Sequence, residues 1–351
     1  MEEKVKDIFN TWLKNEGADF SGVFSASRID SGIDEVIYQQ ACGYRNKAEK
    51  LPNTPDTAFG IASGTKLFTG LAICKLIDEK KLSIEDTIWD LLPFDLGFIN
   101  KNVTVYHLLT HTSGVGDYID EEVNGGDEQL MDLYNKYPVH LWERLEYYLQ
   151  MITPLPPKFE PGKRYAYSNA GFVLLGLIVE TVSGLTYQQF VKENIITPCE
   201  LRHTGFYRMD SLPANTALGY IKDDATGEWR ANIFNMPILG GSDGGLFTCA
   251  KDLTKLWQSI FSYEIFSEEM AVSLLKPHVK MNGADEHSGF YGLGVYVKNN
   301  GSDTVYYAVG GDFGVDFFTA YLPKTKMVVS ALGNTNVNTY PLLETLLETL
   351  K

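Results

Sequence analysis

The sequence predicts an α/β (α+β) fold in which an antiparallel β-sheet, flanked by the N- and C-terminal helices, lies beside an all-helical lobe. Strand-like segments joined by short turns occur near both ends of the 351-residue chain, whereas its middle is rich in helix-like and loop-like segments. Hairpin-linked strands pair antiparallel and need a covering layer, so both chain ends should build one lobe. We expect residues 1–75 and 245–351 to form the α/β sheet lobe and residues 76–244 the mainly helical lobe, with the site between them.

The first part of the chain supplies a helix and two strands of this scheme. MEEKVKDIFNTWLKNEG places its apolar residues on one side of a helix. The segments FSGVFSASRI and DEVIYQQACGY follow as strands, separated by the turn-forming residues Asp30–Gly32. FGIASGTKLFTGLAICKLIDEKK then predicts a helix that begins near Ser63 and is apolar nearly all round, which indicates that it is buried.

The later segments complete both lobes. TVYHLLTHTSG predicts a short helix ended by Gly114, and SNAGFVLLGLIVETVSG a longer one with Ser168 as N-cap and Gly184 just past its end. A Gly-rich stretch runs into the amphipathic helix of CAKDLTKLWQSIF. YGLGVYV, VYYAV, DFFTAYLP and MVVSALG are predicted strands, and LLETLLETLK closes the chain as a helix.

Composition and charge exclude several classes of partner. The chain is 44% hydrophobic and 13% aromatic, which is typical of a folded protein, and its formal net charge is −15. Such a charge repels phosphate backbones and anionic lipids, so we expect no nucleic-acid and no membrane partner. The N-terminus lacks the basic and apolar regions of a signal peptide, and no apolar run reaches spanning length, so a cytoplasmic protein is expected. The four cysteines are scattered, which favours reduced structural thiols.

Ser63 and Lys66 lie at the predicted start of the buried helix. Residues i and i+3 share one face of a helix, so the hydroxyl and the amine can meet. The helix N-terminus and the apolar surroundings both push Lys66 towards its neutral form, which can accept the proton of a nucleophilic serine. Lys66 is also the only charged residue between Phe59 and Cys74, which is unusual for a purely structural helix.

Two further elements fit the chemistry of acyl transfer. Tyr167 stands just before a buried helix, where a phenol can point into a cleft and act as a general base or proton relay, and Asn169 offers an amide to a substrate carbonyl. Val309-Gly310-Gly311-Asp312 lies on a predicted strand, where adjacent glycines allow close approach of a ligand or another backbone. A backbone N–H of this strand, together with that of Ser63, could bind an oxyanion.

Each element is weak evidence by itself. Ser273-Leu274-Leu275-Lys276 repeats the first spacing, and Tyr44-Arg45-Asn46 repeats the second. By themselves, the paired glycines favour a β-bulge. Their combination indicates a catalytic site, because the three elements occur in this order and each lies at the structural boundary that its role requires.

The sequence resembles the class C β-lactamase-like serine hydrolases, which include penicillin-binding DD-peptidases, D-aminopeptidases and family VIII carboxylesterases. The resemblance extends from about Phe20 to Leu332 and includes HLLTHTSGV, FEPGKRYAYSNAGFVLLGLIVETVSG and GGLFTCAKDLTKL. It implies one catalytic unit that works through an acyl-enzyme without metal or cofactor. Ser63 would be the nucleophile, Lys66 its partner and Tyr167 the general base. It further implies that Asn169 binds the substrate carbonyl and that the amides of Ser63 and Asp312 form the oxyanion hole.

The sequence departs from this family at Val309. Lysine, histidine or sometimes tryptophan is usual there, and in β-lactamases and DD-peptidases that residue helps to hold the substrate carboxylate and supports the tyrosine. Valine can do neither, and Asp312 adds a negative charge nearby. We therefore expect weak β-lactamase and carboxypeptidase activity and a better fit for neutral or cationic acyl substrates. His287 is a candidate substitute on sequence proximity alone.

Three other patterns in the sequence have the residue types of functional sites. Gly240-Gly241-Ser242-Asp243-Gly244 fits the nucleophile elbow of α/β-hydrolases, but a further segment separates it from the next helix. His107 and His111 have zinc-ligand spacing, yet no third ligand presents itself, so histidines that hold a loop are favoured. Asp117 and Tyr118 suit either the mouth of the cleft or an exposed loop.

The sequence thus predicts a serine hydrolase that acts on a small-molecule ester, amide or peptide, with esterase favoured slightly. The alternatives are a D-aminopeptidase or DD-peptidase type of amidase, or a catalytically silent penicillin-binding-like protein. Only Val309 supports the silent alternative. The natural substrate, the acyl preference and the oligomeric state are not encoded in any local pattern.

Overall fold

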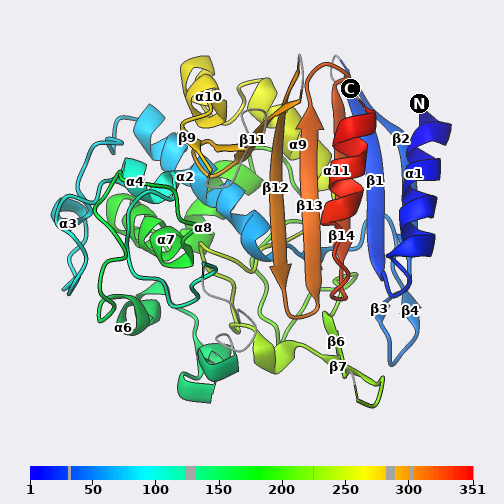
Figure 1. Ribbon diagram of the computed structural model, residues 1–351, viewed down its shortest axis with the longest axis horizontal. Coiled ribbons are helices and arrows are strands. Elements are labelled where there is room, and N and C mark those ends of the chain that lie inside the picture. The colour runs from blue at the N-terminus through cyan, green and yellow to red at the C-terminus, as the bar shows by residue number, and fades with distance from the viewer. Residues whose placement is uncertain are drawn as a thin grey trace.

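The computed structural model describes residues 1–30, 33–122, 131–133, 135–223, 225–281, 289–300 and 303–350. Its centre is an eight-stranded antiparallel sheet with strand order β2-β1-β14-β13-β12-β11-β10-β9 (Figure 1). The strands are β1 (Gly22–Asp30), β2 (Ile33–Cys42), β9 (Val279–Lys280), β10 (Phe290–Tyr291), β11 (Tyr296–Asn300), β12 (Asp303–Asp312), β13 (Val315–Leu322) and β14 (Met327–Gly333). The first and last parts of the chain therefore share one sheet, since β1 pairs with β14.

The sheet has a different helical cover on each face. Side chains alternate along a strand, so neighbours such as Phe317 and Phe318 on β13 enter separate apolar clusters. One face packs against the terminal helices α1 (Glu2–Asn15) and α11 (Tyr340–Thr349), and the other against α9 (Ala250–Phe261), whose Trp257 donates a hydrogen bond to Thr319 of β13. The predicted sheet flanked by both terminal helices is confirmed.

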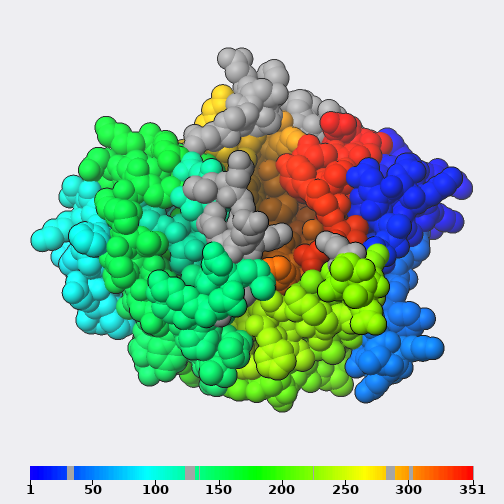
Figure 2. Space-filling view, turned by 60° about the horizontal axis from the view of Figure 1, so that its bottom comes forward, coloured from blue at the N-terminus to red at the C-terminus, as the bar shows by residue number. Residues whose placement is uncertain are grey.

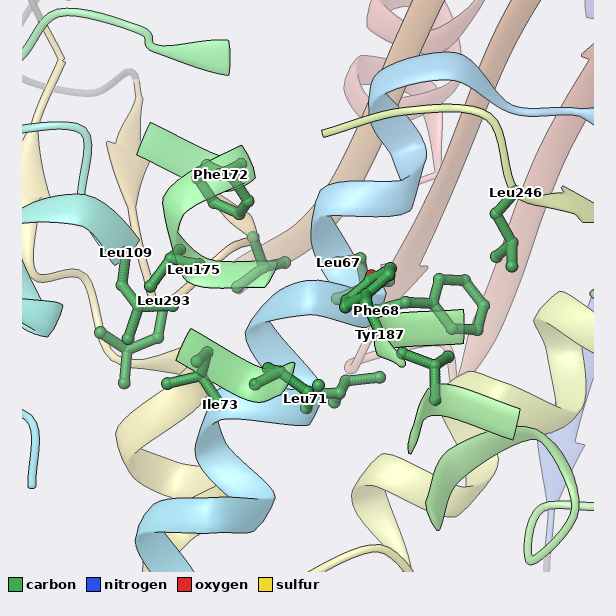
Figure 3. Close-up of a cluster of buried hydrophobic side chains, with 14 of the residues drawn as sticks. Leu67, Phe68, Leu71, Ile73, Leu109, Phe172, Leu175, Tyr187, Leu246 and Leu293 are labelled. Atoms are coloured by element: carbon green, nitrogen blue, oxygen red, sulfur yellow. The ribbon is translucent and has the colours of Figure 1, made fainter. Parts of the chain in front are cut away.

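The helical lobe surrounds α2 (Thr65–Asp78), which continues from the short 3-10 helix η1 (Ala62–Gly64). The side chains of α2 are buried on nearly every side, and Figure 3 shows several of them packed among residues of α7 and the neighbouring loops. The other helices of this region are α3 (Ile88–Leu91), α4 (Val105–Leu109), α6 (Leu149–Ile152), α7 (Asn169–Ser183), α8 (Tyr187–Val191), α10 (Glu268–Leu275), η2 (Val139–Leu141), η3 (Leu145–Tyr148), η4 (Lys192–Ile196) and η5 (Ile233–Asn235).

Three small two-stranded sheets connect these parts. They are β3 (Tyr44–Asn46) with β4 (Leu51–Pro52), β5 (Phe59–Gly60) with β8 (Phe247–Thr248), and β6 (Tyr220–Lys222) with β7 (Trp229–Ala231). The pairing of β5 with β8 brings the segment before η1 against the segment before α9. Residues far apart in sequence thus meet where the cleft begins.

Two sequence predictions of secondary structure were wrong in detail. The helix in TVYHLLTHTSG ends at Leu109 instead of reaching Gly114, because His111 adopts a left-handed φ of 56° that a helix cannot continue. YGLGVYV divides into β10 and β11, because Gly294 has a φ of 92° and the preceding carbonyl of Leu293 packs onto α2. A β-carbon on Gly70 of α2 would lie 2.2 Å from that carbonyl oxygen, so this contact requires glycine.

Among the described residues, no single helix is long and apolar enough to cross a membrane. Asn169–Ser183 and Tyr187–Ile196 meet the length and composition test only as a pair bent by 76°. The residue ranges proposed for the two lobes stay a prediction.

Candidate active site

Ser63 lies at a strained turn between β5 and α2. Ala62, just before it, has a left-handed φ of 44°, which costs an alanine free energy and is typical of functional turns. Gly64 follows, and a β-carbon there would lie 2.3 Å from the Phe317 ring of β13, so the turn packs directly against the sheet. The turn leaves Ser63 half-buried at the floor of a cleft, with its hydroxyl within reach of Lys66.

Lys66 is buried beneath Ser63 and is held by three polar atoms. Its Nζ lies 3.0 Å from Ser63 Oγ and donates hydrogen bonds to Asn169 Oδ1 (2.7 Å) and to the Asp243 backbone carbonyl (2.6 Å). Burial lowers the pKa of Lys66, although the carboxylates of Asp243 and Glu121 oppose this shift. Asn169 Oδ1 and the Asp243 carbonyl oxygen can only accept hydrogen bonds. A neutral amine therefore donates its two N–H groups to them and turns its lone pair towards the Ser63 hydroxyl.

Tyr167 completes the group around the hydroxyl. Its phenol hydrogen-bonds with the Ser63 side chain, and its ring centroid lies 4.9 Å from Lys66 Nζ. Burial raises the pKa of Tyr167 well above its ordinary value, so the resting side chain is a neutral phenol. The structure therefore brings the hydroxyl, the amine and the phenol together, and burial favours the neutral form of both the amine and the phenol.

His111 holds the loop that presents Tyr167. Its Nδ1 accepts a hydrogen bond of 3.0 Å from the Ser168 backbone N–H, and its ring lies 4.5 Å from the Tyr167 ring between centroids. Burial lowers the pKa of His111 well below its ordinary value, so this imidazole stays neutral. His107 is engaged separately with the Thr104 N–H. Both rings thus hold loops, as the sequence favoured.

Asn169 is positioned by the N-terminus of α7. Ser168 Oγ accepts a hydrogen bond of 3.0 Å from the Gly171 N–H, which confirms it as the N-cap. Asp117 lies against the same turn, where its carboxylate accepts from the N–H groups of Asn169 (2.6 Å) and Ala170 (3.3 Å). Burial raises the pKa of Asp117 to about 7, so this contact depends on pH near neutrality.

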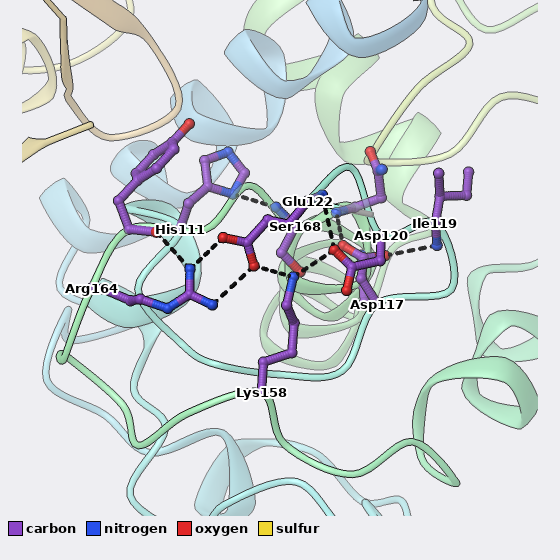
Figure 4. Close-up of polar contacts among 11 residues, drawn as sticks. His111, Asp117, Ile119, Asp120, Glu122, Lys158, Arg164 and Ser168 are labelled. Atoms are coloured by element: carbon purple, nitrogen blue, oxygen red, sulfur yellow. Dashed lines mark hydrogen bonds and ion pairs between the residues drawn. The ribbon is translucent and has the colours of Figure 1, made fainter. Parts of the chain in front are cut away.

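The loop from residue 117 to 122 is anchored next to α7 by ion pairs (Figure 4). Lys158 Nζ lies 2.7 Å from both Asp120 Oδ1 and Glu122 Oε2, and Arg164 also pairs with Glu122. These contacts lower the pKa of Glu122 to about 2, with the Arg164 hydrogen bond as the largest cause. The loop is thereby fixed on one side of Ser63.

The end of β12 forms the opposite wall. Val309, Gly310, Gly311 and Asp312 pair with β13 in an unbroken register, so the alternative of a β-bulge is wrong. A β-carbon on Gly310 would lie 2.1 Å from the Ile61 carbonyl oxygen and 2.9 Å from the Ser63 nitrogen, so this strand presses directly on η1. Nothing lies within 4 Å of the corresponding position on Gly311, which faces open space.

Two cavities meet at Ser63. The larger has a volume of about 1030 Å³ and the smaller about 230 Å³. Residues that line both are Ser63, Glu121, Gly311, Asp316 and Asn338. Figure 2 looks onto the hollow between the green helical lobe and the red α11, with the atoms of β12 and β13 at its back. The nucleophile candidate therefore stands at the junction of two spaces, one large enough for a bulky acyl group.

A family model described as Beta-lactamase matches residues 18–347. The chain belongs to this family. Penicillin-binding protein 4* of Bacillus subtilis is 29% identical over 79% of this chain and 60% of its own length, so the chain spans less than two thirds of that relative. A crystal structure of a penicillin binding protein from Bacillus halodurans is 37% identical, covers 99% of both chains and has a TM-score of 0.86.

A more distant structure, D-amino acid amidase from Ochrobactrum anthropi SV3 complexed with L-phenylalanine amide, has a TM-score of 0.77. It is 19% identical over 99% of this chain and 97% of its own, a likeness that shows the fold alone. Within the Beta-lactamase family, the site roles assigned from sequence to Ser63, Lys66, Tyr167 and Asn169 stay predictions, as do those of Val309, Gly311 and Asp312. The geometry shows that the first four lie together.

Sequence reasoning missed two residues at the site of this Beta-lactamase family member. Asp243 supplies the carbonyl that holds Lys66, and its carboxylate accepts a hydrogen bond from Tyr118, which lines the cleft. Glu121 lines both cavities. No local pattern marks either residue, because each reaches Ser63 only through the tertiary fold.

The alternatives weighed in the sequence lie apart from this chemistry. Ser242 of the elbow-like motif is fully buried and its hydroxyl has no hydrogen-bond partner, so it cannot meet a substrate. Ser273 and Lys276 lie at the end of α10, where the Ser273 carbonyl contacts His278. Tyr44 lies on β3 away from the two cavities. His287 falls outside the described residues.

Proposed function

We propose that this member of the β-lactamase-fold serine hydrolases cleaves an ester or amide through an acyl-enzyme on Ser63. The contact of 3.0 Å between Ser63 Oγ and Lys66 Nζ is the observation on which the proposal depends. Two further observations support the proposal. Burial lowers the pKa of Lys66, and the acceptors Asn169 Oδ1 and the Asp243 carbonyl direct the lone pair of the amine at the hydroxyl. A serine next to a neutral amine is an activated nucleophile.

The acylation step follows from this arrangement. Ser63 Oγ attacks the substrate carbonyl carbon while its proton moves to Lys66 Nζ, and the carbonyl oxygen becomes an oxyanion stabilised by the predicted pair of backbone amides. The Tyr167 phenol then gives its proton to the leaving alcohol or amine and recovers one from Lys66. The bond to the leaving group breaks, and the acyl group stays on Ser63.

Deacylation reverses the proton path. A water molecule attacks the acyl carbonyl and gives up its proton towards Tyr167 and Lys66, and Ser63 Oγ recovers a proton as it leaves. The raised pKa of Tyr167 favours a role as a relay that holds its proton between steps over a role as a standing phenolate. This refines the general-base role that the resemblance implies.

Ester hydrolysis is proposed ahead of amide hydrolysis. An alkoxide or phenolate leaves more readily than an amine, so it depends less on the residue that stands beside Tyr167. Here that residue is Val309, which lines the smaller cavity together with Tyr167. For the same reason we propose weak turnover of β-lactams, and efficient hydrolysis of a cephalosporin by pure protein would overturn that point.

A panel of p-nitrophenyl acyl esters, D-aminoacyl p-nitroanilides and a chromogenic cephalosporin tests the proposal. We expect ester hydrolysis by the wild type and none above background by Ser63→Ala. An amidase would instead prefer the anilides. A catalytically silent protein would hydrolyse none of them and would fail to react with a fluorophosphonate. Cytoplasmic residence remains part of the proposal.

A further inference from the structure

The two acceptors that hold Lys66 come from separate parts of the chain. Asn169 Oδ1 belongs to the first turn of α7 and lies 2.7 Å from Lys66 Nζ. The Asp243 carbonyl oxygen belongs to the Gly-rich segment 240–245 and lies 2.6 Å from the same nitrogen. The lone pair of a neutral amine faces Ser63 only while both acceptors keep their places. The contacts that secure these two groups therefore control how the base meets the nucleophile.

Two consecutive residues of the loop from 117 to 122 contact these two groups. The Asp117 carboxylate accepts hydrogen bonds from the backbone N–H groups of Asn169 at 2.6 Å and Ala170 at 3.3 Å. The Tyr118 hydroxyl donates a hydrogen bond to the Asp243 carboxylate. Asp117 thus holds the residue that carries one acceptor, and Tyr118 holds the residue that carries the other.

The Gly-rich segment needs a contact of this kind. Four of its six residues are glycines, whose backbone has wide conformational freedom. Thr69 of α2 donates a hydrogen bond of 2.6 Å to the Ser242 carbonyl, so the segment stays next to α2. The next carbonyl, that of Asp243, is the one that holds Lys66. The hydrogen bond from Tyr118 restricts the orientation of this residue.

The loop can hold both groups because it is itself secured from its far side. Lys158 pairs with Asp120 and Glu122 at 2.7 Å each, and Arg164 pairs with Glu122 (Figure 4). Burial raises the pKa of Tyr118 well above its ordinary value, so its hydroxyl remains a neutral donor. The loop therefore reaches the two acceptors with an anchored backbone and a phenol that keeps its proton.

We propose that Asp117 and Tyr118 are positioning residues for Lys66, because from one loop they hold the two acceptors that turn its amine towards Ser63. This inference rests on the proposed function of Ser63 and adds the residues that keep its base in place. Both residues act through Asn169 and Asp243, and no proton transfer is assigned to either.

Reaction with a fluorophosphonate tests the inference in a single step. Ser63 Oγ forms a bond to phosphorus, fluoride leaves, and the hydroxyl proton moves to Lys66. The rate constant at saturating reagent and the half-saturating reagent concentration are measured at pH 8, where Asp117 is mostly ionised because its pKa is about 7.

Tyr118→Phe removes one hydroxyl, and Asp117→Asn removes one charge. Each change should lower the saturating rate constant by about tenfold or more, because the amine is no longer held towards Ser63. The half-saturating concentration should change by less than about twofold, whereas a change that only deformed the cleft would alter it as well. A wild-type rate constant in Tyr118→Phe overturns the inference, and this variant gives the answer if Asp117→Asn does not fold.

The double variant shows whether the two residues act on one group. Its rate constant should lie within about twofold of that of the more impaired single variant, because both changes release the same amine. Losses that multiply would mean that Asp117 and Tyr118 act independently, and would also overturn the inference.

Glu122→Gln is the matched control on the same loop. It removes a charge on the side that faces Arg164, while the pair between Asp120 and Lys158 continues to anchor the loop. Its rate constant should stay within about twofold of the wild type. An equal loss in Glu122→Gln overturns the inference and leaves the proposed function standing. If the wild type forms no adduct on Ser63, the proposed function itself fails.

Discussion

The floor of the cleft and its walls are built differently. At the floor, Lys66 is 2% exposed, and its amine contacts Ser63 Oγ and Asn169 Oδ1 within the protein. At the walls, Glu121 and Gly311 are exposed and face two cavities. The buried residues of the floor thus set the reactivity of Ser63 through desolvation and short contacts. The exposed residues of the walls can contact the substrate and so affect which substrate binds.

The floor should be far more sensitive to substitution than the walls, and Lys66 most of all. Lys66→Ala removes the base that receives the Ser63 proton, so kcat/KM for a p-nitrophenyl ester should fall by about 10³ or more. Lys66→Arg is the matched control, since it places a permanent cation at the same position and should be equally inactive. An alanine variant within tenfold of the wild type would show that another group is the base.

The close packing of β12 against η1 can be disrupted by adding one β-carbon at Gly310. Gly310→Ala forces a methyl group against the Ile61 carbonyl and the Ser63 amide, and such overpacking costs about 1–3 kcal/mol of the free energy of unfolding. Gly311→Ala places the same group in open space, so its free energy of unfolding should change by less than about 0.5 kcal/mol. Urea denaturation of both variants measures the difference. Equal losses would mean that the strand does not press on η1.

Asp117 should give a smaller, pH-dependent effect at the base of the wall. Its pKa of about 7 lies above the ordinary value of 3.8, so its stabilising contribution is complete below pH 4 and is lost as pH rises through 7. Asp117→Asn cannot titrate. From pH 5 to pH 8 the wild type should lose about 1 kcal/mol or more of stability relative to this variant. If the free energies of unfolding of the wild type and Asp117→Asn differ by the same amount at pH 5 and at pH 8, the raised pKa of Asp117 is contradicted.

The same contrast explains what the sequence could predict. Ser63 and Lys66 meet because a helical start places residues three apart on one face, and α7 begins at Ser168 because serine caps a helix. Such features depend on a few consecutive residues. The sheet was equally accessible, since β13 and β14 are short apolar runs rich in β-branched and aromatic residues and bounded by turns.

The walls were less accessible because their residues meet only in the folded chain. Asp243 reaches Lys66 across 177 positions, and nothing around Asp243 in the sequence indicates a lysine partner. Glu121 differs from Asp120 and Glu122 only in the side to which the fixed loop turns it. The convergence of Tyr167 with Ser63 was inferred from a family resemblance, since no spacing rule connects two residues in separate elements.

The most direct test of the central claim is to identify the residue that holds the acyl group during turnover. The protein is quenched with acid while it hydrolyses an activated ester, and the acyl adduct is located by peptide mass spectrometry. We predict one adduct, on the peptide that contains Ser63, which disappears in Ser63→Ala. Ester hydrolysis that persists in Ser63→Ala, or an adduct on a different residue, would contradict the account.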